Sequence, residues 1–331
     1  MNEYEMALWI LLALLFSVTL CYALVLRRQY RNLRRLRERE LEEEKKRQQK
    51  NDIRDAMLPE GLLRLFEKGE LSEPQLGEEK KIRAAVMSFN VSGFSELIRS
   101  RTPAEIFGYV NGILKDVVPQ VLYQEGEIDK YVDAGFTAFY MGAPEKALRS
   151  AVSVCEALER QNAEKNYSIG LSYGEVMAGL AGHEKRLGVL TISETTGIAE
   201  FLQEAAEKYG ARILMSGSLK EQIPDFERNY SSRYLGQIYL RAAGQTEELY
   251  DVYDGDGVED KNGKRRTRLL FEKGVEFFQE RKFYDARLHF IEVLKANRMD
   301  KAAKEYLYLC SRYLGQSERE QEQAPIYLEV F

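Results

Sequence analysis

Residues 129–140, with the sequence DKYVDAGFTAFY, decide how the centre of this chain folds. Both halves of the stretch contain aromatic and β-branched side chains, and Asp133, Ala134 and Gly135 between them have the composition of a tight turn. The longer segment 126–140 therefore predicts two antiparallel strands joined by that turn. The flanking sequence supplies the elements that surround this hairpin.

Strands and helices are predicted on both sides of the hairpin. The apolar run at 84–89 predicts a buried strand, and apolar residues at helical spacing predict an amphipathic helix over 103–122. Farther along, the pattern predicts a helix at 145–161, a strand at 167–172, a helix at 193–209, and strands near Ile213 and Leu249. This β-α-β-β-α-β order predicts an α+β domain over 82–254, with a sheet that carries its helices on one face.

Four blocks of this domain resemble the catalytic domain of class III adenylate and guanylate cyclases. They are SFNVSGFS at 88–95, the hairpin at 129–140, the glycine-patterned block at 169–182, and the closing strands at 234–236 and 250–253. The resemblance implies the ferredoxin-like class III nucleotide cyclase fold, and a head-to-tail dimer in which each chain supplies one half of a shared active site. It also implies cyclisation of a nucleoside triphosphate with two divalent cations. We interpret Gly170, Gly174, Gly179 and Gly182 of the third block as turns and points of close backbone approach rather than as phosphate ligands.

The half of the site that binds metal lacks its carboxylates. In the family two Asp residues hold the cations, and the matching positions here are Asn90 and Ala134. Asn90 offers a neutral carbonyl oxygen and Ala134 offers no ligand, whereas hard cations such as Mg²⁺ need carboxylate oxygens. Asp133 is a candidate metal ligand if the turn aims it inward, although we favour a plain turn residue. No metal or other cofactor is therefore expected.

The half that binds base and ribose has changed in the same way. By the resemblance, the ribose-orienting Asn corresponds to Gly197, the phosphate-stabilising Arg to Phe201, and the base-reading position to Leu190. Loss of a cation that is positioned for the transition state removes several kcal/mol of stabilisation. A chain that is defective in both halves cannot complete the site of a partner.

Four candidates for nucleotide contact remain. Lys130 stands where adenylate cyclases have an adenine-contacting Lys, although an ordinary surface residue of the hairpin is the interpretation that we favour. Arg241 is a candidate for a phosphate-facing cation near the end of the domain. Gly93 and Phe94 belong to the first block, which the chain retains. No complete set of catalytic residues is predicted.

The amino-terminal segment predicts a membrane anchor. Residues 6–26 form a run of 21 residues without a charge, long enough for a helix to cross a bilayer. Lys and Arg follow the run, so residues 1–5 should lie outside and the chain from Arg27 onward in the cytoplasm. We expect a single-pass protein of the inner or plasma membrane, with a charged helical stalk at 27–68 and a linker at 69–81.

The sequence after the central domain predicts a small helical region. A polar, Gly-containing segment at 255–267 predicts a linker, and the helical pattern returns over 268–316. Gly274, Phe277, Ala286 and Phe290 have the spacing of a tetratricopeptide repeat (TPR), so this region is TPR-like. One and a half repeats bury no core alone, so these helices should pack on the main domain or on a partner. Residues 317–331 form a tail, of which 317–323 is polar and expected to be loose.

Composition and charge disfavour several other functions. The chain has 48 Lys and Arg against 53 Asp and Glu, a net charge of −5, which disfavours a nucleic-acid surface. Its 3 Cys and 2 His are too few and too scattered for a disulfide framework, a thiolate zinc site or a His-based metal site.

The sequence thus predicts a membrane-anchored, catalytically inactive cyclase-homology protein that acts as a dimerising signal-transduction or regulatory module. Its expected partners are a second copy or a related cyclase-domain protein, and a protein on the carboxyl-terminal helices. Two alternatives stay open. One is an atypical adenylate cyclase that converts ATP to 3',5'-cyclic AMP and diphosphate with Mg²⁺ or Mn²⁺, using Asp133 or a partner's carboxylates. The other is a membrane-tethered interaction scaffold that uses the TPR-like tail.

Overall fold

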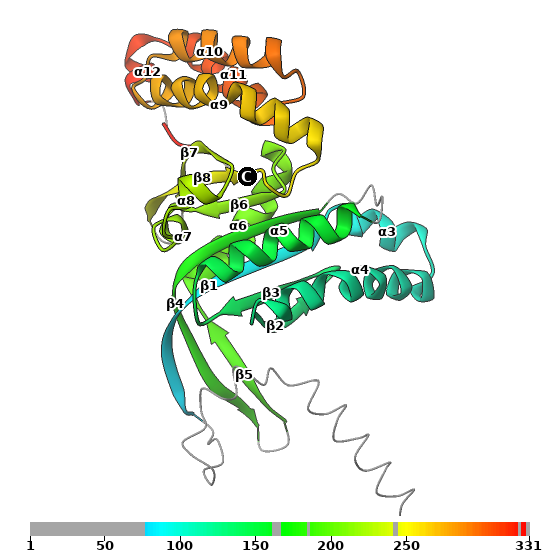
Figure 1. The fold of residues 1–331 in the computed structure, drawn as a ribbon. Helices are drawn as coiled ribbons and strands as arrows, with labels where there is room; N and C mark the ends of the chain where they lie inside the picture. Colours follow the sequence, from blue (N-terminus) through cyan, green and yellow to red (C-terminus); the bar gives the residue numbers. More distant parts are fainter. Residues whose placement is uncertain (1–76, 161–166, 184–185, 241–243, 324–325, 329–331) are drawn as a thin grey trace, which may run out of the picture. The chain divides into compact units, whose positions relative to one another are not determined.

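A computed structural model describes residues 77–160, 167–183, 186–240, 244–323 and 326–328. Its centre is an eight-stranded sheet with the order β2-β3-β1-β4-β6-β8-β7, and β5 pairs with β4 beside this path (Figure 1). Neighbouring strands are antiparallel, except for the parallel pair β4 and β6. The strands are β1 Glu79–Val91, β2 Glu127–Val132, β3 Gly135–Tyr140, β4 Tyr167–His183, β5 Arg186–Ile192, β6 Ile213–Ser216, β7 Ser232–Leu240 and β8 Gln245–Val252.

The helices confirm the α+β class and the predicted order of elements in the central domain. α3, β5, α7 and α8 were not predicted from the sequence. The helices are α3 Phe94–Ser100, α4 Pro103–Tyr123, α5 Glu145–Glu159, α6 Glu194–Tyr209, α7 Gly217–Lys220, α8 Phe226–Asn229, α9 Val258–Gln279, α10 Phe283–Ala296, α11 Lys301–Leu314 and α12 Glu318–Gln323.

Helices cover both faces of the sheet, which corrects the expectation of helices on one face. Met87 and Phe89 of β1 pack in the apolar cluster that includes α4 and α5, which we call the first cluster. Val86, the residue directly before Met87, packs with Ala199 of α6. Because successive side chains of a strand point to opposite faces, α6 lies on the face opposite α4 and α5. The uninterrupted apolar run of β1 is the sequence signal of this two-sided burial.

Two glycines of β4 let α6 lie close to the sheet. A side chain at Gly170 would overlap the carbonyl oxygen of Ala199, and one at Gly174 would overlap the hydroxyl of Thr195. Ser172 Oγ, on the same strand, donates a hydrogen bond of 2.6 Å to the carbonyl oxygen of Thr195. The structural role predicted for these two glycines is therefore confirmed.

Several element boundaries differ from the predictions because tertiary contacts extend the elements. β4 continues to His183 and forms a hairpin with β5, where the sequence predicts a strand over 167–172. β1 begins inside the predicted linker 69–81, because the whole strand pairs with β4. α9 begins inside the predicted linker 255–267, and α12 occupies most of 317–323, which was expected to be loose.

The carboxyl-terminal helices pack on the central domain, as the sequence predicts. One apolar cluster, which we call the second cluster, contains Leu202 of α6, Leu235 of β7 and Phe271 of α9. Within the tail, a side chain at Gly274 would come 2.9 Å from the Phe290 ring, so this glycine lets α9 and α10 approach closely. The helical tail is observed, and its likeness to a tetratricopeptide repeat stays a prediction.

A buried group of charges joins the tail to the sheet. Arg233 of β7 is fully buried and donates to Asp251 of β8 at 2.9 Å and to Asp300 at the start of α11 at 2.5 Å. Lys264 of α9 donates to Asp251 at 3.0 Å and lies 2.7 Å from Asp256. We call these five residues the junction cluster, in which three carboxylates face two cations.

The amino-terminal predictions lie outside this description. The predicted span at 6–26, the stalk at 27–68 and most of the linker at 69–81 fall on residues that the structure does not describe. Among the residues that it does describe, none forms a helix long and apolar enough to cross a membrane.

Candidate functional site

The two positions that the resemblance assigns to metal ligands meet at one end of the β1–β3 pair. The strands are antiparallel with Phe89 opposite Phe136, so Asn90 and the turn that precedes Gly135 lie at the same end. A side chain at Gly135 would overlap the carbonyl oxygen of Phe89, so the turn lies directly against the end of β1. The fold therefore brings these two segments together.

The chemistry of this end is not that of a metal centre. Ala134 is fully buried in the first cluster, together with Phe89 and Phe136. The Oδ1 atom of Asn90 accepts a hydrogen bond of 2.8 Å from the backbone N–H of Val91. One neutral amide oxygen that is already engaged does not fit a hard divalent cation, which requires several oxygen ligands with carboxylates among them.

Asp133 is the carboxylate nearest to these positions in the sequence, and it is exposed. It has a left-handed backbone conformation with φ of 54° at the tip of the hairpin. Its carboxylate makes no hydrogen bond or ion pair with any described residue. The expected turn residue is confirmed, and ligation of a metal would require the turn to reorient. Within the described ranges, no three His, Cys, Asp or Glu side chains lie close enough together to hold a metal ion.

Gly93 and Phe94 shape the segment that leaves β1. Gly93 precedes α3 with φ of 77°, in the left-handed region that favours glycine. Phe94 is partly buried and packs against the first cluster. Both residues have a structural role here, and their contact with a nucleotide stays a prediction.

The half of the site that the resemblance assigns to the base gathers around α6. Lys130 Nζ of β2 lies 3.1 Å from Glu200 Oε1 of α6, and both side chains are about half exposed. Thr191 Oγ1 of β5 donates to Asp129 Oδ2 at 3.0 Å. Burial raises the pKa of Asp129, and the hydrogen bond from Thr191 opposes the rise. These contacts bring β2, β5 and α6 together.

The decisive positions of this half carry no polar group for a nucleotide. Gly197 is exposed, and no atom lies within 4 Å of the place where its side chain would begin. Phe201, one turn later on α6, is partly buried against the second cluster. α6 therefore offers neither a ribose donor nor a fixed cation at these two positions. Arg241, the candidate for a phosphate-facing cation, lies outside the described residues.

The base-reading position, Leu190, belongs to an exposed apolar surface on the β4–β5 hairpin. Met177 of β4 pairs directly with Ile192 of β5, and Leu190 lies two residues before Ile192, so the three side chains share one face. The exposed fractions of Met177, Leu190 and Ile192 are 39%, 51% and 56%. We call these three residues the hairpin strip. The strip was not predicted because β5 was not predicted, although the apolar and β-branched run at 187–192 is typical of a strand.

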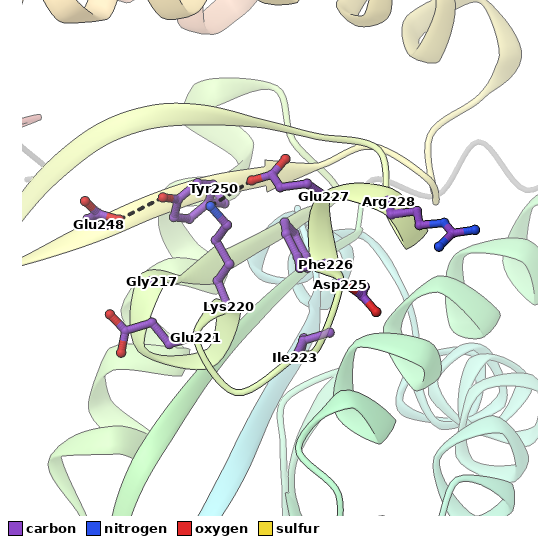
Figure 2. A pocket seen from close by; sticks show the side chains of 10 residues that line it. All are labelled: Gly217, Lys220, Glu221, Ile223, Asp225, Phe226, Glu227, Arg228, Glu248 and Tyr250. Atoms are coloured by element: carbon purple, nitrogen blue, oxygen red, sulfur yellow. Dashed lines mark hydrogen bonds and ion pairs between the residues drawn. The ribbon is translucent and has the colours of Figure 1, made fainter.

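A pocket of about 520 Å³ opens beside α7 and α8, and none of the nucleotide positions that the structure describes lines it (Figure 2). Lys220 Nζ lies 4.3 Å from the centre of the Tyr250 ring and 2.8 Å from Glu227 Oε1, and Tyr250 donates to Glu248 Oε2 at 2.7 Å. The ammonium group of Lys220 therefore lies between the Tyr250 ring and the Glu227 carboxylate. The lining residues are Gly217, Lys220, Glu221, Ile223, Asp225, Phe226, Glu227, Arg228, Glu248 and Tyr250.

The arrangement of the sheet and helices matches that of a known enzyme domain. A bacterial light-regulated adenylyl cyclase superposes with a TM-score of 0.56 and 17% sequence identity, over 65% of this chain and 62% of its own. The central domain has the class III cyclase fold. The fold expected from the resemblance is therefore confirmed, and we refer to residues 79–252 as the cyclase-fold domain.

Sequence relatives share parts of the chain. An uncharacterized protein of Mycobacterium tuberculosis is 30% identical over 155 residues, which are 44% of this chain and 27% of that protein. The terminal-differentiation-specific adenylate cyclase of Dictyostelium discoideum is 17% identical over 245 residues, 71% of this chain and 12% of that protein. This chain thus spans a minor part of the length of these relatives. No protein-family model matches it.

Proposed function

We propose that this chain is a catalytically inactive protein with a cyclase-fold domain, which acts as a dimerising regulatory module at a membrane. The observation that carries the proposal is Ala134, which fills a metal-ligand position with a methyl group buried in the first cluster. A carboxylate at this point would be buried among apolar side chains, without the partners that an ionised group needs.

Both halves of the shared site support this proposal. Asn90 and Ala134 remove the metal ligands, and Gly197 and Phe201 remove the ribose donor and the phosphate-facing cation that the resemblance implies. Loss of one preorganised group of this kind typically costs about 3 kcal/mol of transition-state stabilisation. A pair of two such chains, or of this chain with an intact relative, therefore has a defective half in every site.

The hairpin strip favours a second copy of this chain as the partner. Contiguous exposed apolar side chains often mark a protein interface. In a symmetric dimer the same surface meets itself, and an uncharged apolar surface does so without repulsion. Leu190 supports this interpretation, because it belongs to the strip and also stands at the base-reading position. By the resemblance, that position belongs to a site shared between two chains.

The predicted membrane span at 6–26 completes the proposal. The Lys and Arg that follow it favour a cytoplasmic location for the cyclase-fold domain. Tethering two copies to the same membrane face raises their effective concentration, so even a weak interface is populated. Such a dimer would transmit a signal through association rather than through a cyclic nucleotide.

A cyclase assay on the purified full-length chain, with ATP or GTP and Mn²⁺, tests the proposed inactivity. We expect no cyclic nucleotide above the blank. Asp133→Ala and Asp225→Ala are matched variants, because both aspartates are exposed and left-handed, with φ of 54° and 50°. Activity that is lost in Asp133→Ala and kept in Asp225→Ala would contradict the proposal and favour the atypical cyclase.

Ile192→Asp tests the proposed dimer surface by placing a charge in the hairpin strip. We expect this variant of the solubilised chain to self-associate at least tenfold more weakly in a sedimentation or mass-photometry titration, because the charge would be desolvated at the interface. Met299→Asp is the control, since Met299 is 72% exposed and lies in the tail. Equal self-association of the two variants would show that the strip is not part of the interface.

A further inference from the structure

The outer edge of β7 holds a short segment of the chain from beyond α12. β7 is the last strand in the sheet order, so this edge is not covered by another strand among the described residues. Leu328 forms a parallel bridge with Ile238, and its N–H donates to the carbonyl oxygen of Gln237 at 2.6 Å. Leu328 thus pairs with the edge as one residue of an added strand does, and Figure 1 draws residues 326–328 in red beside β7. We call them the edge segment.

Two consecutive side chains determine the register of the edge segment. Leu328 is 2% exposed and packs in the second cluster, between the sheet and the tail. The ring of Tyr327 stacks on that of Tyr239, with centroids 5.3 Å apart. On β7, Ile238 is buried and Tyr239 is 39% exposed. The buried Leu328 therefore lies beside the buried Ile238, and Tyr327 lies beside the exposed Tyr239. A shift by one residue would place the tyrosine in the apolar site of the leucine.

Three contacts within the described part of the chain hold the edge segment. They are one backbone hydrogen bond, one buried leucine and one ring pair. The helix that precedes the segment is itself held, because Arg281 Nε donates to the carbonyl oxygen of Glu322 in α12 at 2.8 Å. The covalent connection therefore supplies a high effective concentration of the segment beside β7. An equivalent segment on another molecule would make the same contacts without that advantage.

We infer that β7 and the apolar site of Leu328 form a strand-acceptor site, which is filled in cis by the edge segment and accepts the same segment from a second copy of this chain. An open strand edge pairs readily with an added strand, through backbone hydrogen bonds and alternate side-chain sites. Reciprocal exchange would place the Leu328 of each copy in the acceptor of the other and close a symmetric pair. The acceptor lies on β7 and the hairpin strip on β4 and β5, so this inference does not rest on the proposed function.

The test uses the full-length chain with Leu328→Asp, which disfavours the segment in cis and leaves β7 unchanged. The probe is a labelled peptide with the sequence QAPIYLEVF, residues 323–331. We expect its Kd for this variant to be at least tenfold lower than its Kd for the unmodified chain, in which the attached segment competes. The Met299→Asp control keeps the edge segment and should bind the peptide as weakly as the unmodified chain does.

A second peptide, with Leu328 replaced by Asp, tests the specificity of the acceptor and should bind neither protein. The inference is wrong if the folded Leu328→Asp chain fails to bind the first peptide. It is also wrong if that chain binds both peptides equally, because the apolar site would then play no part in recognition. Circular dichroism of the variant shows whether the fold is retained.

Hydrogen exchange of the unmodified chain provides a measurement that does not depend on the variant. The Leu328 amide donates to Gln237, so its exchange should be slow. A large excess of the first peptide should accelerate that exchange at least fivefold, because displacement of the edge segment frees the amide. Fast exchange without peptide, or a rate that the peptide leaves unchanged, would overturn the inference.

Discussion

The hairpin end of β1 and the junction cluster differ in how they use charge. At the hairpin end, Ala134 is buried among apolar side chains and the carboxylate of Asp133 is exposed. At the junction, Arg233 is fully buried and is paired with Asp251 and Asp300. Charge is retained in a protein interior only where partners compensate for desolvation. This chain therefore keeps buried ion pairs where they join its tail to its sheet, and lacks carboxylates where a metal would need them.

Removal of the central cation of the junction should have the largest effect. Arg233→Met leaves Asp251 and Asp300 without their shared partner in a buried site, so we expect the free energy of unfolding to fall by about 3–5 kcal/mol. Urea denaturation followed by circular dichroism measures it. Arg265→Met, at an exposed position of α9, should stay within about 0.5 kcal/mol of the unmodified chain. Similar losses in both variants would mean that the junction cluster has no special role in stability.

A carboxylate at the hairpin end should destabilise the fold without creating a metal site. Ala134→Asp would bury a polar group in the first cluster, so we expect a loss of about 3 kcal/mol in unfolding free energy. Asp133→Asn, at the exposed neighbouring position, should be nearly neutral. Thermal denaturation with and without Mn²⁺ measures both effects. Stabilisation of the Ala134→Asp variant by Mn²⁺ would contradict this prediction, because it would show that the hairpin end can bind a metal ion.

The glycines that let α6 lie close to the sheet should have a smaller effect on the free energy of unfolding. Gly170→Ala would force a side chain against the carbonyl oxygen of Ala199, so we expect a loss of about 2 kcal/mol. Gly179→Ala, on the same strand, should be close to neutral, since its nearest neighbouring atom would be 3.5 Å away. Chemical denaturation of the pair checks the prediction. Equal stability of the two variants would show that α6 moves away from β4 at no cost.

The pH dependence of Asp256 should be the smallest effect. Burial raises its pKa, and Lys264 opposes the rise. An acidic group whose pKa is higher in the folded state destabilises the fold while it is ionised. This penalty is lost as the pH falls through that pKa, because the group is then protonated. Asp256→Asn removes the penalty of the buried charge, while Lys264 keeps Asp251 as a partner. We expect the variant to be up to about 1 kcal/mol more stable than the unmodified chain at pH 7.

That advantage of Asp256→Asn should shrink as the pH is lowered, because the unmodified carboxyl group takes up its proton at a higher pH than an ordinary aspartate does. Denaturation at several pH values measures the difference. Asp225→Asn, at an exposed aspartate, serves as the control, and its difference from the unmodified chain should not follow this course. An advantage of Asp256→Asn that grows as the pH falls would contradict the assigned direction of the pKa shift.

Local periodicity predicted most of the central elements, because apolar spacing reflects the face that an element buries. The helix predicted at 103–122 is α4 at Pro103–Tyr123, and the predicted hairpin is β2 and β3. The predictions failed where distant segments decide the structure. α9 begins within a polar, Gly-containing stretch because Lys264 and Thr267 of that stretch are buried against the rest of the protein. The uninterrupted apolar run of β1 indicates burial on both faces of the sheet, but it does not show which helix packs on the second face, and α6 is placed there only by the fold.

The sequence alone determined which chemical groups stand at the site, since Asn90, Ala134, Gly197 and Phe201 are visible without coordinates. Only the tertiary structure decided that Ala134 is buried while Asp133 is exposed, because a side chain's surroundings depend on the segments that pack around it. Arg233 and Asp300 are 67 residues apart in the chain, and folding brings them into one buried ion pair. The energy of such a pair depends on distance and desolvation, and neither quantity is encoded by any short stretch of sequence.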